Sequence, residues 1–112
     1  MLRVRQVFQA KYGRGDELVA LFQEFNTQMW DAGGALRAFR ILTDAAGPFF
    51  TIATEGDVES LAAWESGFKG TMAQPWVGDW FSRMVPLVES GRREFYHIVA
   101  YGGATEQRWS GP

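Results

Sequence analysis

His97 is the only histidine of the chain, and imidazole is the side chain that titrates nearest to neutral pH. A histidine is therefore the natural candidate for a general acid or base. His97 lies in an apolar run near the C-terminus, and no Asp or Glu stands at a spacing diagnostic of a catalytic partner. The alternative hypothesis is a sheet histidine that is hydrogen-bonded to a neighbouring residue.

Aromatic residues make up 15% of the chain, with nine Phe and five Trp. So many large rings in a small domain exceed what one core needs, and the surplus favours an interface or a lined pocket. Four rings in the second half of the chain could line an apolar cavity between a helix and a sheet. The alternative for these residues is ordinary core packing. They are Trp64, Phe68, Trp76 and Trp80.

Several arginines fall inside predicted strands, which is unusual for a charged residue. Arg40 shares its parity with apolar neighbours, so it is a candidate contact for an anionic ligand. The alternative roles of Arg40 are an ion pair with an acidic residue, an ion pair at an interface, or protection of a sheet edge. Arg92, Arg93 and Glu94, in contrast, are interpreted as solvated charge at the end of an element.

Composition and charge exclude several classes of function. The chain has no cysteine, which excludes disulfides and thiol chemistry, and one histidine leaves too few ligands for a metal site. We predict neither a metal nor a cofactor. A net charge of −2 gives no basic surface for nucleic acid or an anionic membrane. No run approaches the roughly 18 apolar residues of a membrane span, and no signal peptide precedes the domain, so we expect a cytoplasmic protein.

The strands are predicted from period-two alternation and from the turns between them. The first covers Leu2–Lys11, where Val4 and Phe8 share a parity with Gln6. The others are expected at Ala35–Thr43, Phe49–Glu55 and Arg93–Ala100.

The helices are predicted from apolar residues at helical spacing. A stripe of five such residues begins after Asp16-Glu17 and ends at Gly33-Gly34, where glycine suits a helix C-cap. A second helix is expected after Asp57, whose carboxylate could cap it, and Gly67 and Gly70 suggest that it is short. A further helical segment begins at Pro75 and stops at Pro86.

The predicted order is β-α-β-β-α-β, which is an α+β, ferredoxin-like βαββαβ fold. We expect a four-stranded antiparallel sheet with helices on one face, as a single domain over residues 1–101 followed by a loosely ordered tail over residues 102–112. Apolar residues occupy both parities of the strands, and the helices can cover only one face. The sequence therefore predicts a homodimer that pairs the uncovered sheet faces.

Three strings carry a resemblance to a known superfamily: VFQAKYGRGDEL, GPFFTIATEGDVESLAAWE and WFSRMVPLVESGRREFYHIV. Together they span most of residues 4–99. They resemble the dimeric α/β-barrel superfamily, and its NIPSNAP-like branch in particular. The resemblance implies a βαββαβ subunit that pairs into a barrel, with a ligand cavity between helices and sheet.

The resemblance does not carry over a catalytic set. Haem-degrading members of the superfamily use a helix-borne histidine together with an asparagine and a tryptophan. In this chain His97 is predicted in the last strand, and Asn26, the only asparagine, in the first helix. Neither position fits that set, which argues against haem degradation.

Two main hypotheses for function follow. The first is a NIPSNAP-like dimeric α/β-barrel protein that binds a small apolar or aromatic ligand. The alternative is a small cofactor-independent monooxygenase or isomerase that acts on an aromatic or polyketide-like compound, with His97 as the acid or base. A third possibility is a purely structural interaction module.

Overall fold

The computed structural model describes residues 1–31 and 39–100. Its element order confirms the predicted arrangement, with the second helical region divided into two helices. The tail over residues 102–112, the Gly33-Gly34 helix end and the predicted strand residues 35–38 lie outside the described residues. The elements are β1 Leu2–Ala10, α1 Gly15–Asp31, β2 Arg40–Thr43, β3 Thr51–Val58, α2 Leu61–Met72, α3 Val77–Met84, the 3₁₀ turn η1 Val85–Leu87, and β4 Val88–His97.

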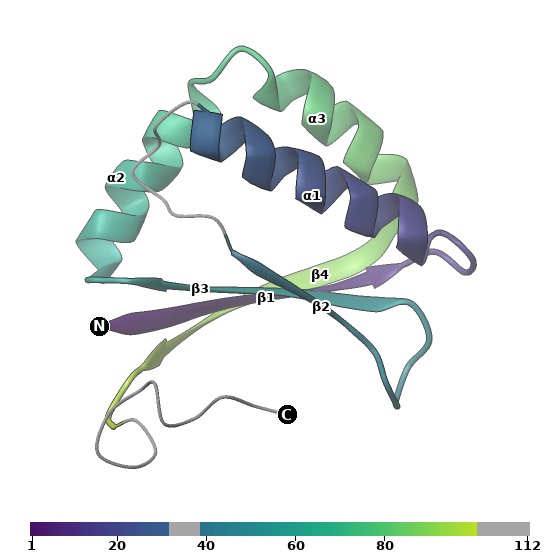
Figure 1. Ribbon diagram of the computed structural model, residues 1–112, viewed down its shortest axis with the longest axis horizontal. Coiled ribbons are helices and arrows are strands. Elements are labelled where there is room, and N and C mark those ends of the chain that lie inside the picture. The colour runs from purple at the N-terminus through teal and green to yellow at the C-terminus, as the bar shows by residue number, and fades with distance from the viewer. Residues whose placement is uncertain (32–38, 101–112) are drawn as a thin grey trace.

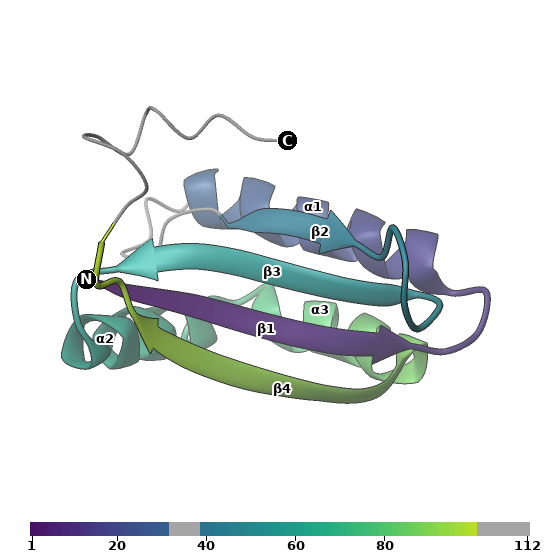
Figure 2. The same ribbon diagram turned by 90° about the horizontal axis from the view of Figure 1, so that it is seen from below.

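The four strands form an antiparallel sheet in the order β2-β3-β1-β4. The helices lie together on one face of this sheet (Figure 1), and the view from below shows the strands in front of them (Figure 2). The α+β, ferredoxin-like prediction is thus confirmed. β1 is central: its Val4 stands opposite Gly56 of β3 and Phe95 of β4.

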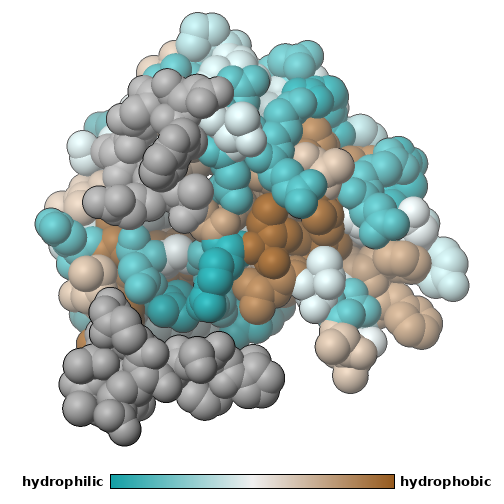
Figure 3. Space-filling view, viewed as in Figure 1, coloured by the Kyte–Doolittle hydropathy of each residue, from teal (hydrophilic) through white to brown (hydrophobic). Residues whose placement is uncertain are grey.

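The core lies between the helical layer and the sheet. The predicted stripe of α1 faces it, and Leu18, Leu21 and Phe22 are buried there. Figure 3 shows hydrophobic side chains gathered between the helices and the sheet, and hydrophilic ones over the outer side of the helices. The buried cluster consists of Ala10, Leu18, Leu21, Phe22, Ile52, Trp80 and Leu87.

The predicted cap of the second helix is wrong. Asp57 lies in β3, where its Oδ1 accepts a hydrogen bond from Arg3 Nε at 2.6 Å. The helix begins at Leu61, and the Ser60 hydroxyl accepts from the backbone N–H of Ala63 at 3.1 Å. β3 continues past the predicted turn because it pairs with the full length of β1, as far as Leu2 opposite Val58. Serine and aspartate are both favoured N-cap residues, so the sequence alone could not decide between Asp57 and Ser60.

Pairing with β1 also moves the boundaries of β3 and β4. β4 begins at Val88, five residues earlier than predicted, since it pairs with β1 from its start. β3 begins at Thr51, after Phe49 and Phe50; Phe50 has a φ of 60°, a left-handed conformation that is rare for an aromatic residue. α2 runs through its glycines to Met72, and Gly67 is buried in it.

The register places most of the strand hydrophobics on one face. Ile41 stands opposite Thr54, and Ile52 shares the parity of Thr54, so all three face the helices. Ile41 and Ile52 have opposite parity in residue number, and yet they lie on the same face. Odd or even position in one strand does not show which residues of a second strand lie on the same face until the register between the two strands is known.

Charged side chains occupy much of the opposite face, here called the outer face. Among these charges, Glu55 contacts Arg3, Arg5 and Arg40 at 3.4, 3.9 and 2.9 Å. Beside it Val7, Ala53 and Leu42 form a short apolar strip across β1, β3 and β2, because Ala53 stands opposite both of the others. The outer face is therefore an apolar strip beside an ion-pair network.

Candidate functional site

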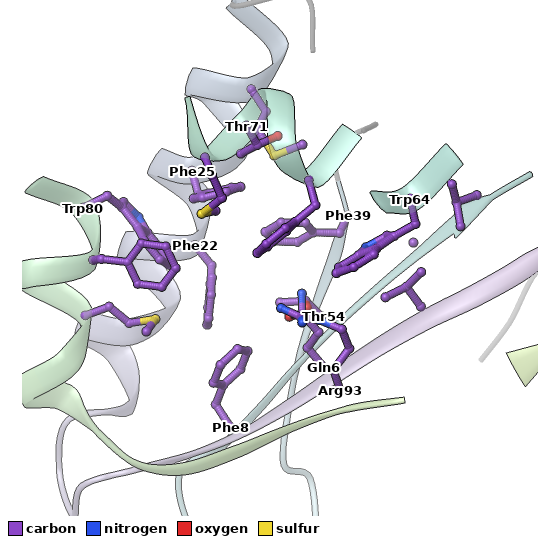
Figure 4. A pocket seen from close by; sticks show the side chains of 18 of the residues that line it. Gln6, Phe8, Phe22, Phe25, Phe39, Thr54, Trp64, Thr71, Trp80 and Arg93 are labelled. Atoms are coloured by element: carbon purple, nitrogen blue, oxygen red, sulfur yellow. The ribbon is translucent and has the colours of Figure 1, made fainter. Parts of the chain in front are cut away.

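A cavity of about 170 Å³ lies between the helical layer and the sheet. Every helix and three of the four strands, namely β1, β3 and β4, contribute side chains to it. Its lining is mostly apolar and rich in rings, as Figure 4 shows. The aromatic lining residues are Phe8, Phe22, Phe25, Phe39, Trp64, Phe68, Trp80 and Phe81.

One wall of the cavity is a set of interlocked rings from α1 and α3. The Trp80 ring lies 4.8 Å from Phe25 and 5.6 Å from Phe22, both measured between centroids. The indole N–H of Trp80 donates to the backbone carbonyl of Leu21 at 2.8 Å, which fixes α3 on α1. Rings at such distances and tilts gain from edge-to-face contact as well as from burial. This wall is therefore rigid and apolar.

A second aromatic surface comes from α2. Trp64 and Phe68 stand one helical turn apart, and their rings are stacked with centroids 4.9 Å apart and planes at 17°. Phe95 of β4 meets Trp64 edge-on at 5.1 Å. The guanidinium carbon of Arg93 lies 4.7 Å from the Trp64 centroid and 5.3 Å from that of Phe68. These are cation–π distances.

Three polar side chains of the sheet meet at one end of the cavity: Gln6, Thr54 and Arg93 (Figure 4). Arg93 Nε donates to Gln6 Oε1 at 3.0 Å, because the two residues stand opposite each other on β4 and β1. Thr54 is 2% exposed. Arg93 lies on the edge strand and is exposed as a residue, yet partial burial of its guanidinium lowers its pKa below the ordinary arginine value.

The remaining polar residues of the lining are engaged elsewhere. The Thr71 hydroxyl donates to the backbone carbonyl of Gly67 at 3.0 Å within α2. Asp57, at the rim, is bonded to Arg3. Among the described lining residues there is no imidazole, and the one carboxylate is ion-paired. The site is thus suited to binding a ring and to stabilising negative charge on it, rather than to moving protons.

The structure brings three of the six predicted site residues to this cavity. Trp64, Phe68 and Trp80 line it. Trp76 does not, and instead packs edge-on against Phe25 with centroids 5.0 Å apart. Trp76 is thus one of three predicted site residues that lie away from the cavity. The other two, His97 and Arg40, have polar side chains.

Those two polar candidates lie at other places on the sheet. His97 is exposed at the end of β4, opposite Leu2, and is not part of the lining. Arg40 lies on the outer face, where its Nη2 is 2.9 Å from Glu55 Oε1. Neither geometry provides a contact to a ligand inside the cavity.

Sequence reasoning missed the polar end of the cavity. One signal was present, since Gln6 is a polar residue on the same parity as Val4 and Phe8. Arg93 was interpreted as solvated charge at a strand end, but it lies in the middle of β4, with its side chain on the helix side. Recognising it required the true start of the strand.

Comparison with known proteins supports the fold. No protein-family model matches the sequence, and no curated protein is detectably similar to it. Solved structures do match: a NIPSNAP domain protein from Burkholderia xenovorans is 16% identical, with a TM-score of 0.77, over 92% of this chain and 99% of that one. A NIPSNAP family protein from Agrobacterium tumefaciens is 13% identical, with a TM-score of 0.77, over 93% and 98%.

An antibiotic biosynthesis monooxygenase-like protein from Deinococcus radiodurans is similar too. It is 14% identical, with a TM-score of 0.67, over 94% of this chain and 99% of that one. At these identities the likeness shows the fold alone. The predicted resemblance to NIPSNAP-like α/β-barrel proteins is thus confirmed as a likeness of fold.

Over residues 1–31 and 39–100 no helix has the length and apolar character to cross a membrane. In the same ranges no three His, Asp or Glu side chains gather as they would to hold a metal ion.

Proposed function

We propose that this protein binds a small aromatic molecule in the cavity between its helices and its sheet. The observation that carries the proposal is a ring-lined space of about 170 Å³ with a polar end. For comparison, an apolar cavity of roughly 150 Å³ in another protein accommodates benzene. Natural ligand sites combine an apolar lining with a few convergent polar groups, which is the arrangement described above. A ligand of one or two rings fits best.

The test is a titration of the isotope-labelled protein with indole, a neutral bicyclic probe, followed by NMR. We expect shifts concentrated at the cavity residues, such as the indole N–H of Trp64. Thr54→Phe places a ring in the cavity and should abolish them. Leu42→Phe adds the same ring on the outer face and should leave binding intact. Shifts spread evenly over the surface, or unchanged binding in Thr54→Phe, would contradict the proposal.

A homodimer that pairs the outer faces is part of the same proposal. The strip formed by Val7, Ala53 and Leu42 supports it, because Leu42 is 41% exposed in the isolated chain and a second copy would cover it. The charges around Glu55 would rim such an interface. Light scattering at micromolar concentration should give twice the chain mass, and Leu42→Arg should shift the mass toward that of one chain.

The second candidate function is a cofactor-independent monooxygenase or isomerase acting on an aromatic or polyketide-like compound. It is favoured by the cationic end of the cavity, since Arg93 could stabilise an oxyanion formed on a bound ring. Oxygen consumption by the purified protein with an anthrone as substrate tests the oxygenase form. Turnover that Arg93→Gln abolishes would support it, and no consumption above that of buffer would exclude it for this class of compound.

A further inference from the structure

Arg93 differs from the other strand arginines because, within residues 1–31 and 39–100, it has no acidic partner. Arg3, Arg5, Arg40 and Arg92 each contact a carboxylate. Within the described part of the chain Arg93 forms no ion pair, and its one hydrogen bond runs from Nε to the neutral amide of Gln6. None of the described residues therefore neutralises the positive charge at the polar end of the cavity.

The geometry of the guanidinium leaves a specific pair of donors available. Its central carbon lies over the rings of Trp64 and Phe68, and its Nε is bonded to Gln6. The two terminal nitrogens, Nη1 and Nη2, bond to no acceptor in the described residues. Stacking uses the face of the guanidinium, whereas hydrogen bonds lie in its plane. An arginine that lies over two rings and is held at Nε thus presents its two terminal nitrogens as a fork.

A fork of two parallel N–H groups is complementary to a carboxylate, which accepts both in a bidentate, charge-assisted contact. The one carboxylate of the described cavity lining, that of Asp57, is held by Arg3 Nε at 2.6 Å. Thr54 of β3, which stands opposite Gln6, adds a hydroxyl at the same end. The rest of the lining is aromatic and suits a ring.

We propose that the ligand of this cavity is an aromatic carboxylate, with its ring among Phe22, Phe25 and Trp80 and its carboxylate on the fork of Arg93. This inference rests on the proposed binding function and specifies the chemical class of the ligand. Gln6 acts as a positioning residue, because its Oε1 orients the guanidinium. Partial burial of Arg93 strengthens its attraction for an anion, since the local dielectric is lower than that of water.

Benzoate and benzamide are the probes, since they share a ring and a planar head group and differ in charge. Dissociation constants come from NMR titration of the full chain. We expect benzoate to bind about tenfold more tightly than benzamide, the preference typical of a hydrogen bond between charged groups. Arg93→Gln should bring the ratio to about one and leave benzamide binding within about twofold. Arg92→Gln, a matched change of the neighbouring outward arginine, should leave the ratio unchanged.

The outcomes separate the two proposals. If neither probe binds, the binding function itself fails. If benzamide binds and benzoate is not preferred, binding stands and the carboxylate inference is overturned. Equal loss of preference in Arg93→Gln and Arg92→Gln would also overturn it, because the effect would then be general charge. Arg93→Lys keeps the charge without the fork and should retain only part of the preference, which gives a second test if Arg93→Gln does not fold.

Discussion

The two faces of the sheet use the same residue type for opposite purposes, and Arg92 and Arg93 show this most directly. They are neighbours on β4, so their side chains point to opposite faces. Arg92 lies on the outer face with its Nε 3.4 Å from Glu94 Oε2. Arg93 lies on the helix side, over two rings and beside an amide. Arg92 is thus ion-paired within the protein, whereas Arg93 is the residue that we propose to bind an anionic ligand.

The difference teaches how to tell a structural charge from a functional one. On the outer face the clustered arginines have carboxylate partners, and Glu55 alone contacts three of them. On the helix side aromatic rings surround a cation, and in the described residues no carboxylate offsets it. Even partial burial of a charge without a counterion has a cost, so an anionic ligand would be favoured beside Arg93.

Of the substitutions on the two faces, those at Trp80 should change the free energy of unfolding most. Trp80 is 3% exposed and packs in the core. Trp80→Ala removes a buried ring and should lower the free energy of unfolding by about 3–5 kcal/mol. Chemical denaturation measures this. Trp80→Phe keeps most of the packing but loses the bond to Leu21, and should cost about 1 kcal/mol. If Trp80→Ala and Trp80→Phe lowered the free energy of unfolding equally, packing would not be the main contribution of Trp80.

Asn26 tests whether the helix side depends on a polar clamp as well as on rings. Its Nδ2 donates to the Phe39 carbonyl at 2.9 Å, and its Oδ1 accepts the Phe39 N–H at 3.1 Å. Both backbone groups of Phe39, a cavity-lining residue, are thus fixed by one side chain of α1. Asn26→Ala should lower the free energy of unfolding by about 1–3 kcal/mol and weaken indole binding. Unchanged binding in a destabilised variant would limit Asn26 to a structural role.

Glu55 is the corresponding test on the outer face. Its side chain is 15% exposed, whereas the arginines around it are 32–69% exposed. Glu55→Gln should cost about 1 kcal/mol, because partly exposed ion pairs contribute little individually and this one is shared by three partners. Glu94→Gln removes a single exposed pair and should cost less than about 0.5 kcal/mol. Neither change should alter the ratio of benzoate to benzamide binding.

The smallest effect is expected at Glu24, whose carboxylate accepts a hydrogen bond from Arg83 and joins α1 to α3. That hydrogen bond is the main cause that lowers the pKa of Glu24 below its ordinary value. A depressed pKa stabilises the fold above the pKa of the unfolded chain, and the contribution is lost as the pH falls through the folded pKa. Arg83→Gln should therefore lower the melting temperature slightly at pH 7 and by less at pH 3.

Much of the fold could be predicted from the sequence, because it depends on local patterns. The stripe of Leu18, Leu21 and Phe22 identifies α1 by spacing alone, and the alternation in Leu2–Ala10 identifies β1. The order of the elements then leaves few topologies. The aromatic part of the site was also accessible, since Trp64, Phe68 and Trp80 recur at helical intervals.

What the sequence alone determined is thus the order of elements, the apolar side of each helix and the surplus of rings. Only the tertiary structure decided the strand register, and with it the face that each arginine occupies. Register depends on contacts between residues far apart in the chain, such as Gln6 with Arg93 and Arg3 with Asp57, and no local pattern encodes them. For that reason Arg40, a candidate ligand contact from parity within one strand, lies on the outer face paired with Glu55, and Arg93, interpreted as solvated, lies at the cavity.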